Sequence, residues 1–221
     1  MADSKRIVWD KTGERKFETG TDRGVLYVQK ADGTYDVGIP WNGLTAVNES
    51  PSGAEPNDLW ADNMKYATLR SAEQFGATIE AYTYPDEFAK CDGSDELATG
   101  VYAGGQTRQA FGMSYRTLLG NDVSGTALGY KIHLVYGATA NPSEKNYETV
   151  NEDPDAITLS WEITTVGVAM DGKQPISHVV VDSTKVDAAK LTTLENALYG
   201  SEETDPRLPL PSELVTMFAT V

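Results

Sequence analysis

Apolar and polar residues alternate strictly along Ile157–Thr164, where every odd-numbered residue is apolar and every even-numbered residue is polar. A side-chain period of two is typical of a β-strand with one buried face and does not suit a helix. The same alternation occurs in residues 110–116 and 129–136. These three segments predict half-buried antiparallel strands, and they make the chain mainly β.

Weaker patterns of the same kind occur along the rest of the chain. Turn signals such as Ala31-Asp32-Gly33 and Asp171-Gly172 separate them. Many short strands with such punctuation predict an antiparallel β-sandwich or β-barrel. The weaker strand candidates are Val25–Gln29, Gly43–Val47, Tyr66–Arg70, Ala77–Tyr84 and Ile176–Val181.

One flanking α-helix is predicted over residues 185–199, where apolar residues recur at near-helical spacing. Asp182-Ser183-Thr184 offers N-cap side chains before it, and Gly200 offers a C-terminal stop after it. Pro85–Lys90 is expected to form one further turn. The helix is expected to pack on one face of the sheet.

Two segments do not fit easily inside a self-contained domain. Residues 48–63 read NESPSGAEPNDLWADN, with no strand pattern, and loops that long are uncommon unless they are disordered or functional. Residues 200–221 form an arm that ends in a predicted short helix, which is marginal alone and needs a docking surface on its own domain or on another copy. The contact candidates are Pro56, Leu59, Trp60 and Met64 for the first segment, and Leu214, Met217 and Phe218 for the second.

The charge is strongly acidic, with 18 basic and 33 acidic residues and a net charge of −15. Residues 1–23 hold six basic and five acidic residues, so the remainder carries the whole acidic excess. This balance disfavours tight binding to DNA phosphates, and it suggests that residues 1–23 are an N-terminal arm that lies against an acidic surface. No internal repeat is found, so residues 1–221 are interpreted as one domain.

Sequence motifs for catalysis, cofactors and metals are missing from the chain. There is no phosphate-binding glycine motif, no His-Glu-x-x-His spacing and no Gly-x-Ser-x-Gly elbow. His133 and His178 are the only histidines, so a metal site would need carboxylate help, and His133 is interpreted as an exposed strand residue. Acidic neighbours would raise the thiol pKa of Cys91. We therefore expect no enzyme activity, no cofactor and no metal.

The sequence also has no recognisable membrane-spanning or secretory segment. No stretch approaches ~18 consecutive apolar residues, and residues 1–6 lack the apolar segment of a secretory signal. Synthesis in a cytoplasm is therefore the expectation.

Aromatic residues suggest a second class of function. Most of them fall on the apolar phase of strands, as Phe111, Tyr115 and Trp161 do, and are expected in the core. Trp41 and Trp60 lie in or beside loops and are candidates for contact with something outside the domain. The alternative function is therefore a carbohydrate-binding or host-adhesion β-sandwich module.

Several long runs of residues resemble, in the same order, the major tail protein, or tail tube protein, of long non-contractile-tailed bacteriophages. The similarity covers nearly the whole chain. The runs are Glu14–Tyr27, Trp41–Pro56, Glu80–Phe88, Phe111–Thr117, Tyr130–Gly137, Asp182–Asp187 and Arg207–Pro211.

This resemblance implies a structural virion protein with a flanking helix on a β-sandwich. Hexameric rings of the protein would stack into a tail tube through which the genome is ejected. It implies contacts with further copies, the tape measure protein, the tail terminator and the distal tail proteins, and no catalytic residues. An acidic bore would repel DNA and let it slide without specific binding, and residues 48–63 would serve as an inter-ring loop.

Overall fold

The structure is a computed structural model that describes residues 6–149 and 155–219. Its main feature is one antiparallel sheet of eight strands in the order β2-β1-β11-β12-β13-β8-β3, with β14 paired to β12 beside β13. The strands are β1 (Lys16–Val28), β2 (Ile39–Pro40), β3 (Leu44–Glu49), β8 (Gly76–Ala81), β11 (Phe111–Asn121), β12 (Gly125–Ala140), β13 (Leu159–Thr165) and β14 (His178–Asp182).

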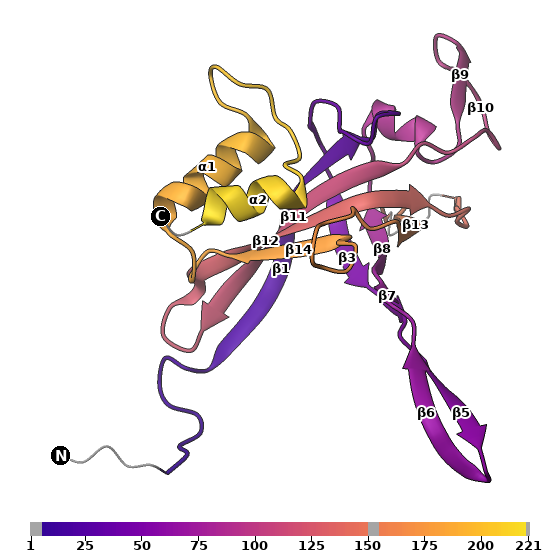
Figure 1. The fold of residues 1–221 in the computed structure, drawn as a ribbon. Helices are drawn as coiled ribbons and strands as arrows, with labels where there is room; N and C mark the ends of the chain where they lie inside the picture. Colours follow the sequence, from indigo (N-terminus) through magenta and orange to yellow (C-terminus); the bar gives the residue numbers. More distant parts are fainter. Residues whose placement is uncertain (1–5, 150–154, 220–221) are drawn as a thin grey trace.

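Three two-stranded ladders and the helices complete the fold (Figure 1). The predicted class, mainly β with a flanking helix and a short C-terminal helix, is confirmed. The ladders are β4 (Ser52–Gly53) with β7 (Glu73–Gln74), β5 (Pro56–Ala61) with β6 (Met64–Arg70), and β9 (Asp95–Ala98) with β10 (Val101–Ala103); the helices are a 3₁₀ turn (Asp86–Lys90), α1 (Ala188–Tyr199) and α2 (Pro211–Phe218).

The sheet curls because β12 changes partners along its length. Lys131–Val135 pair with β14, whereas Ala138–Ala140 pair with β13. The sheet continues from β13 through β8 to β3, and β3 returns beside β1. Thr45–Val47 and Glu18–Thr21 line opposite sides of a groove of about 300 Å³ between these two strands. The result is a sandwich-like, partly closed arrangement.

Aromatic side chains fill the core inside this curl. Trp41, Phe88 and Trp161 lie with ring centroids 4.6 to 5.8 Å apart, in tilted or edge-to-face arrangements that favour aromatic pairs. Trp41 is only 3% exposed. The prediction that Trp41 contacts something outside the domain is therefore wrong, because its loop folds back so that the indole reaches Trp161.

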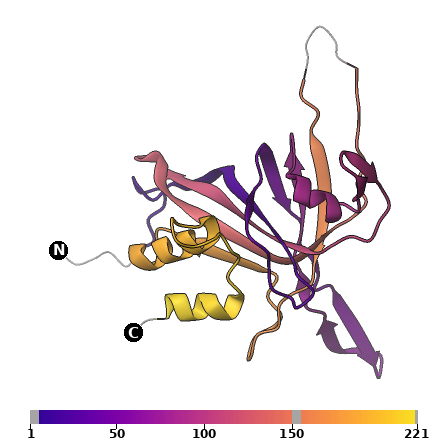
Figure 2. The ribbon, with the colours of Figure 1, turned by 90° about the horizontal axis from the view of Figure 1, so that it is seen from above.

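A second core lies on the opposite face of the sheet, where α1 and α2 pack (Figures 1 and 2). Leu134 of β12 faces this core, while Val135 faces the first core. The middle of β12 is therefore buried on both faces, as are Phe111–Tyr115 of β11, and the expectation of one buried face is wrong in both strands. For the same reason His133, predicted to be exposed, is only 6% exposed.

Helix α1 begins three residues later than predicted. Its N-cap is Asp187, whose carboxylate accepts hydrogen bonds from the backbone N–H groups of Ala189 and Lys190 at 3.0 and 3.2 Å. The predicted cap at Asp182–Thr184 is wrong, because Asp182 instead accepts from the N–H of Thr184 in a turn that ends β14. The predicted stop at Gly200 is confirmed by its φ of 82°.

We expect Asp187→Ala to lower the free energy of unfolding by about 1 kcal/mol, because two backbone donors of the first turn lose their acceptor. Asp187→Asn keeps an acceptor and is expected to stay within a few tenths of a kcal/mol of the natural protein. Urea unfolding at unchanged m value measures both. An alanine variant as stable as the natural protein would show that the cap contributes nothing.

Residues 48–63, expected to be an irregular loop, are mostly strand. They contain the end of β3, all of β4 and all of β5. Asp62 and Asn63, at the tip between β5 and β6, both have positive φ, at 52° and 62°, as a two-residue type I′ hairpin turn requires. Sequence alternation is missing here because both faces of the hairpin are exposed, so nothing separates an apolar face from a polar one.

The terminal segments are more ordered than the predicted arms. β1 begins at Lys16, so the described residues that precede the sheet are 6–15 rather than a segment extending to residue 23. The 3₁₀ turn confirms the extra turn expected at Pro85–Lys90. The β9–β10 hairpin was not predicted, because its residues are also exposed on both faces.

Candidate assembly surface and histidine cluster

The β5–β6 hairpin projects away from the body of the protein (Figure 1). It is connected to the main sheet through the short β4–β7 ladder, in which Ser52 pairs with Gln74 and Gly53 with Glu73. Among residues 54–72, all of which are described, none is buried. The hairpin therefore contributes no side chain to either core.

Large apolar side chains are nevertheless concentrated on this hairpin. Trp60 is 68% exposed and Tyr66 is 75% exposed. An isolated two-stranded hairpin is marginally stable in water, and a group of exposed apolar side chains marks an interaction site. The exposed large apolar residues of the hairpin are Leu59, Trp60, Met64, Tyr66 and Leu69.

The inter-ring contact candidates predicted from sequence all lie on this hairpin. Pro56 begins β5, Leu59 and Trp60 lie within it, and Met64 begins β6. All four are exposed. Tyr66 and Leu69 were missed as contact candidates because the sequence placed them in a strand of the body; their position beside a Leu-Trp pair and an Asp-Asn turn was the available signal.

Polar contacts hold the two strands of the hairpin together. The Asp58 carboxylate accepts a hydrogen bond from the Thr68 hydroxyl at 2.7 Å and lies 2.8 Å from the Lys65 ammonium. The contact with Lys65 holds the pKa of the Asp58 carboxyl below its usual value. The hairpin therefore has its own cross-strand contacts without help from the body.

The C-terminal candidates lie against the domain itself. Leu214 is buried, and Met217 and Phe218 are partly buried against the second core. The docking surface for α2, left open by the sequence, therefore belongs to the same subunit. An apolar groove of about 500 Å³ remains between α2 and β14, lined among others by Leu214, Val215 and Phe218.

Other segments also expose apolar side chains. Ile7, Val8 and Trp9 are exposed in the segment before β1, and Leu97, Val101 and Tyr102 are exposed on the β9–β10 hairpin. In Figure 1 the β9–β10 hairpin and the β5–β6 hairpin leave the body in different directions. The exposed apolar surface is therefore spread over several projections and not confined to one patch.

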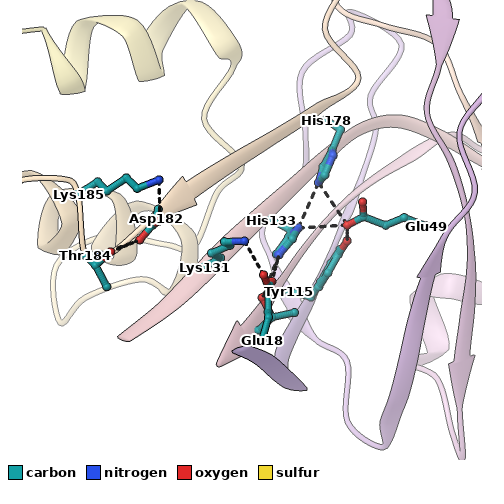
Figure 3. Close-up of polar contacts among 10 residues, drawn as sticks. Glu18, Glu49, Tyr115, Lys131, His133, His178, Asp182, Thr184 and Lys185 are labelled. Atoms are coloured by element: carbon teal, nitrogen blue, oxygen red, sulfur yellow. Dashed lines mark hydrogen bonds and ion pairs between the residues drawn. The ribbon is translucent and has the colours of Figure 1, made fainter. Parts of the chain in front are cut away.

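A partly buried polar cluster lies where the curled sheet brings β3 toward β12 and β14 (Figure 3). His133 comes from β12, His178 from β14 and Glu49 from the end of β3. The His133 Nδ1 atom lies 3.3 Å from His178 Nε2 and 3.3 Å from Glu49 Oε1, and His178 Nε2 lies 3.8 Å from the same carboxylate oxygen.

Aromatic neighbours hold the two imidazoles in place. The His133 ring stacks on Tyr115, with centroids 4.5 Å apart and an interplanar angle of 8°. The His178 ring lies 4.3 Å from that of Phe75. The Tyr115 hydroxyl donates a hydrogen bond of 2.7 Å to Glu49 Oε1, which fixes this carboxylate as well.

A second carboxylate lies on the other side of His133. Its Nε2 atom is 3.1 Å from the Thr117 hydroxyl and 3.7 Å from Glu18 Oε1. Glu18 is also paired with Lys131, and this hydrogen bond lowers the pKa of its carboxyl against the opposing effect of burial. His133 therefore has an acceptor beside each of its ring nitrogens.

Burial governs the protonation of the cluster. It lowers the pKa of His133 and of His178, although the Glu49 carboxylate acts in the opposite direction on both. Burial and the hydrogen bond to Glu49 raise the pKa of Tyr115. Both imidazoles are therefore neutral at neutral pH, with a lone pair on one nitrogen of each ring.

Sequence reasoning missed this cluster because its members are far apart in the chain and lie on three strands. The signal available was that both histidines fall within strand patterns, one of them flanked by apolar residues on both sides. Cys91 behaves as expected: burial and the neighbouring Asp92 raise its thiol pKa to about 12, so it does not suit a nucleophile.

No protein-family model matches this chain, and no curated protein matches it. None of the helices in residues 6–149 and 155–219 has the length and apolarity needed to span a bilayer.

Proposed function

We propose that this protein is the structural subunit of a bacteriophage tail tube, in which hexameric rings stack into a conduit for genome ejection. The observation that carries the proposal is the β5–β6 hairpin, whose five large apolar side chains lie outside both cores of the subunit. Covering such a surface with identical copies removes it from water. The resemblance of the sequence to tail tube proteins supports the same conclusion.

Strand edges offer a route to ring closure. Among the described residues, β14 pairs with β12 alone and β3 pairs with β8 alone, so each leaves one edge of backbone donors and acceptors outside the ladders. Unpaired edges readily accept a strand from another chain. Pairing between subunits would join the separate sheets into one continuous wall.

The charge suits a conduit for DNA. With a net charge of −15, the subunit repels a phosphate backbone instead of binding it through counterion release. A nucleic acid then moves through the bore without adhering to the wall. In this proposal the partners are further copies, the tape measure protein, the tail terminator and the distal tail proteins, and the protein resides in the virion tail after synthesis in the host cytoplasm.

Electron microscopy of the purified full chain across a concentration series tests the proposal. We expect uniform hollow rings or tubes at high concentration, with the fraction of assembled protein rising with concentration as measured by sedimentation. A protein that stays monomeric up to its solubility limit, without rings at any concentration, would contradict the proposal.

A carbohydrate-binding or host-adhesion module is the second candidate, because Trp60 and Tyr66 are exposed aromatic side chains on a projecting element. Aromatic faces are the usual platform for sugar rings. Binding to a glycan array by a monomer, lost in Trp60→Ala, would favour this candidate over the tail tube.

A further inference from the structure

We propose that Glu49, His133 and His178 form a binding site for a divalent transition-metal ion of the zinc class. The proposal concerns the isolated subunit and does not depend on the assembly proposed above. The three side chains come from β3, β12 and β14 and direct one ligand atom each toward a common point (Figure 3).

The separations between the three ligand atoms match the requirements of the ion. Zinc binds nitrogen and carboxylate oxygen at about 2.0–2.2 Å, usually in a tetrahedral arrangement, which places neighbouring ligand atoms roughly 3.3–3.5 Å apart. The observed separations are 3.3 Å, 3.3 Å and 3.8 Å.

The ligand types select the class of ion. Two imidazoles with one carboxylate suit zinc and its neighbours in the first transition row, whereas magnesium and calcium prefer sets made of oxygen ligands. A neutral imidazole has one ring nitrogen with a lone pair that it can offer to a cation. The carboxylate contributes the negative charge that a buried cation requires.

The surrounding hydrogen bonds have the form found around metal ligands. A ligating histidine usually donates its other ring N–H to a carboxylate or another acceptor, which fixes the ring and its tautomer. His133 Nε2 faces the Thr117 hydroxyl at 3.1 Å and Glu18 at 3.7 Å. The Tyr115 hydroxyl orients the Glu49 carboxylate in the same way.

Glu49 is the most exposed member of the cluster. The side chain of Glu49 is 39% exposed, whereas those of His133 and His178 are 8% and 17% exposed. An ion can therefore enter beside Glu49 and keep water as a fourth ligand. Once bound, it would tie the end of β3 to β12 and β14, with which β3 shares no ladder in the described residues.

Calorimetric titration of the full chain, without an affinity tag and after dialysis against a chelator, tests this proposal with ZnCl₂. We expect binding of one equivalent, and visible absorption bands of a four-coordinate site when CoCl₂ replaces zinc. At free zinc about one hundred times Kd, Tm should rise by roughly 5–10 °C, because the ion binds the folded state only.

Ligand variants and a matched control locate the site. His178→Gln and Glu49→Gln are each expected to weaken zinc binding at least tenfold and to remove the cobalt bands. Glu162→Gln, an exposed carboxylate of β13 outside the cluster, should bind as the natural protein does. Circular dichroism confirms that each variant is folded.

Two results would overturn the proposal. One is the absence of saturable zinc binding by the folded natural protein, which would leave the cluster as a hydrogen-bonded network only. The other is zinc binding that His178→Gln and Glu49→Gln both leave unchanged. Neither result bears on ring formation, which is measured separately on the same preparations.

Discussion

Replacing residues 54–72 with the dipeptide Asn-Gly is expected to abolish ring stacking and tube formation while the Tm of the subunit stays within about 2 °C of the natural value. The replacement removes every exposed apolar side chain of the β5–β6 hairpin and no buried residue. It leaves β4 and β7 joined by a favourable two-residue turn between Gly53 and Glu73. Electron microscopy and differential scanning calorimetry measure the two quantities.

The replaced segment must not include residues 48 and 49. Both lie in β3 within the main sheet, and Asn48 donates a hydrogen bond to Glu80. As a milder version, the double change Trp60→Ala with Tyr66→Ala is expected to reduce assembly strongly, while Asn57→Ala on the same hairpin should not. Tubes of normal yield without the hairpin would exclude it as the assembly surface, and a large drop in Tm would show that it supports the subunit.

Trp161→Ala is expected to lower the free energy of unfolding by about 3–5 kcal/mol, the cost typical of removing a large buried aromatic side chain. Trp161 is fully buried in the centre of the first core, in contact with Trp41, Tyr84 and Phe88. The vacated volume is enclosed by a curled sheet that cannot easily collapse into it. Such a loss is a large share of the 5–15 kcal/mol that stabilises a typical domain.

Trp161→Phe provides the control. The indole N–H of Trp161 is buried and has no hydrogen-bond partner among the described residues, so phenylalanine keeps an aromatic ring and removes an unsatisfied donor. We expect it to cost less than half as much as alanine in urea unfolding. An alanine variant that loses less than 1 kcal/mol would contradict the central place of this residue in the core.

The strands of the sheet could be predicted from sequence because burial differs between their faces. Trp161 and Ile163 are buried while Glu162 and Thr164 are exposed, as the alternation predicts. Ile157, the first residue of the predicted strand, lies outside β13 and is 41% exposed. The alternation is lost where the two faces of a strand are alike. Both faces are buried in the middle of β12 and in Phe111–Tyr115 of β11, and both are exposed in β5, which was not predicted as a strand. The strand predicted at Tyr66–Arg70 is confirmed by β6.

The candidate sites were predictable to different degrees. Leu59 and Trp60 stand out in sequence because an apolar pair within a polar segment has no core partner nearby, and the structure leaves both exposed. The histidine cluster was not predictable, since Glu49 reaches His133 only after the sheet curls. The spacing of these residues in the sequence does not indicate that they meet in the folded chain.

The two-sided burial of β12 separates consecutive residues into different environments. Leu134 packs in the core beneath α1 and α2, and Val135 packs in the aromatic core on the other face. A substitution at Leu134 therefore acts on the packing of the helices, whereas one at Val135 acts on the aromatic core. A charged side chain in the middle of this strand would be buried on either face, so this part of β12 separates two apolar cores and tolerates few charged substitutions.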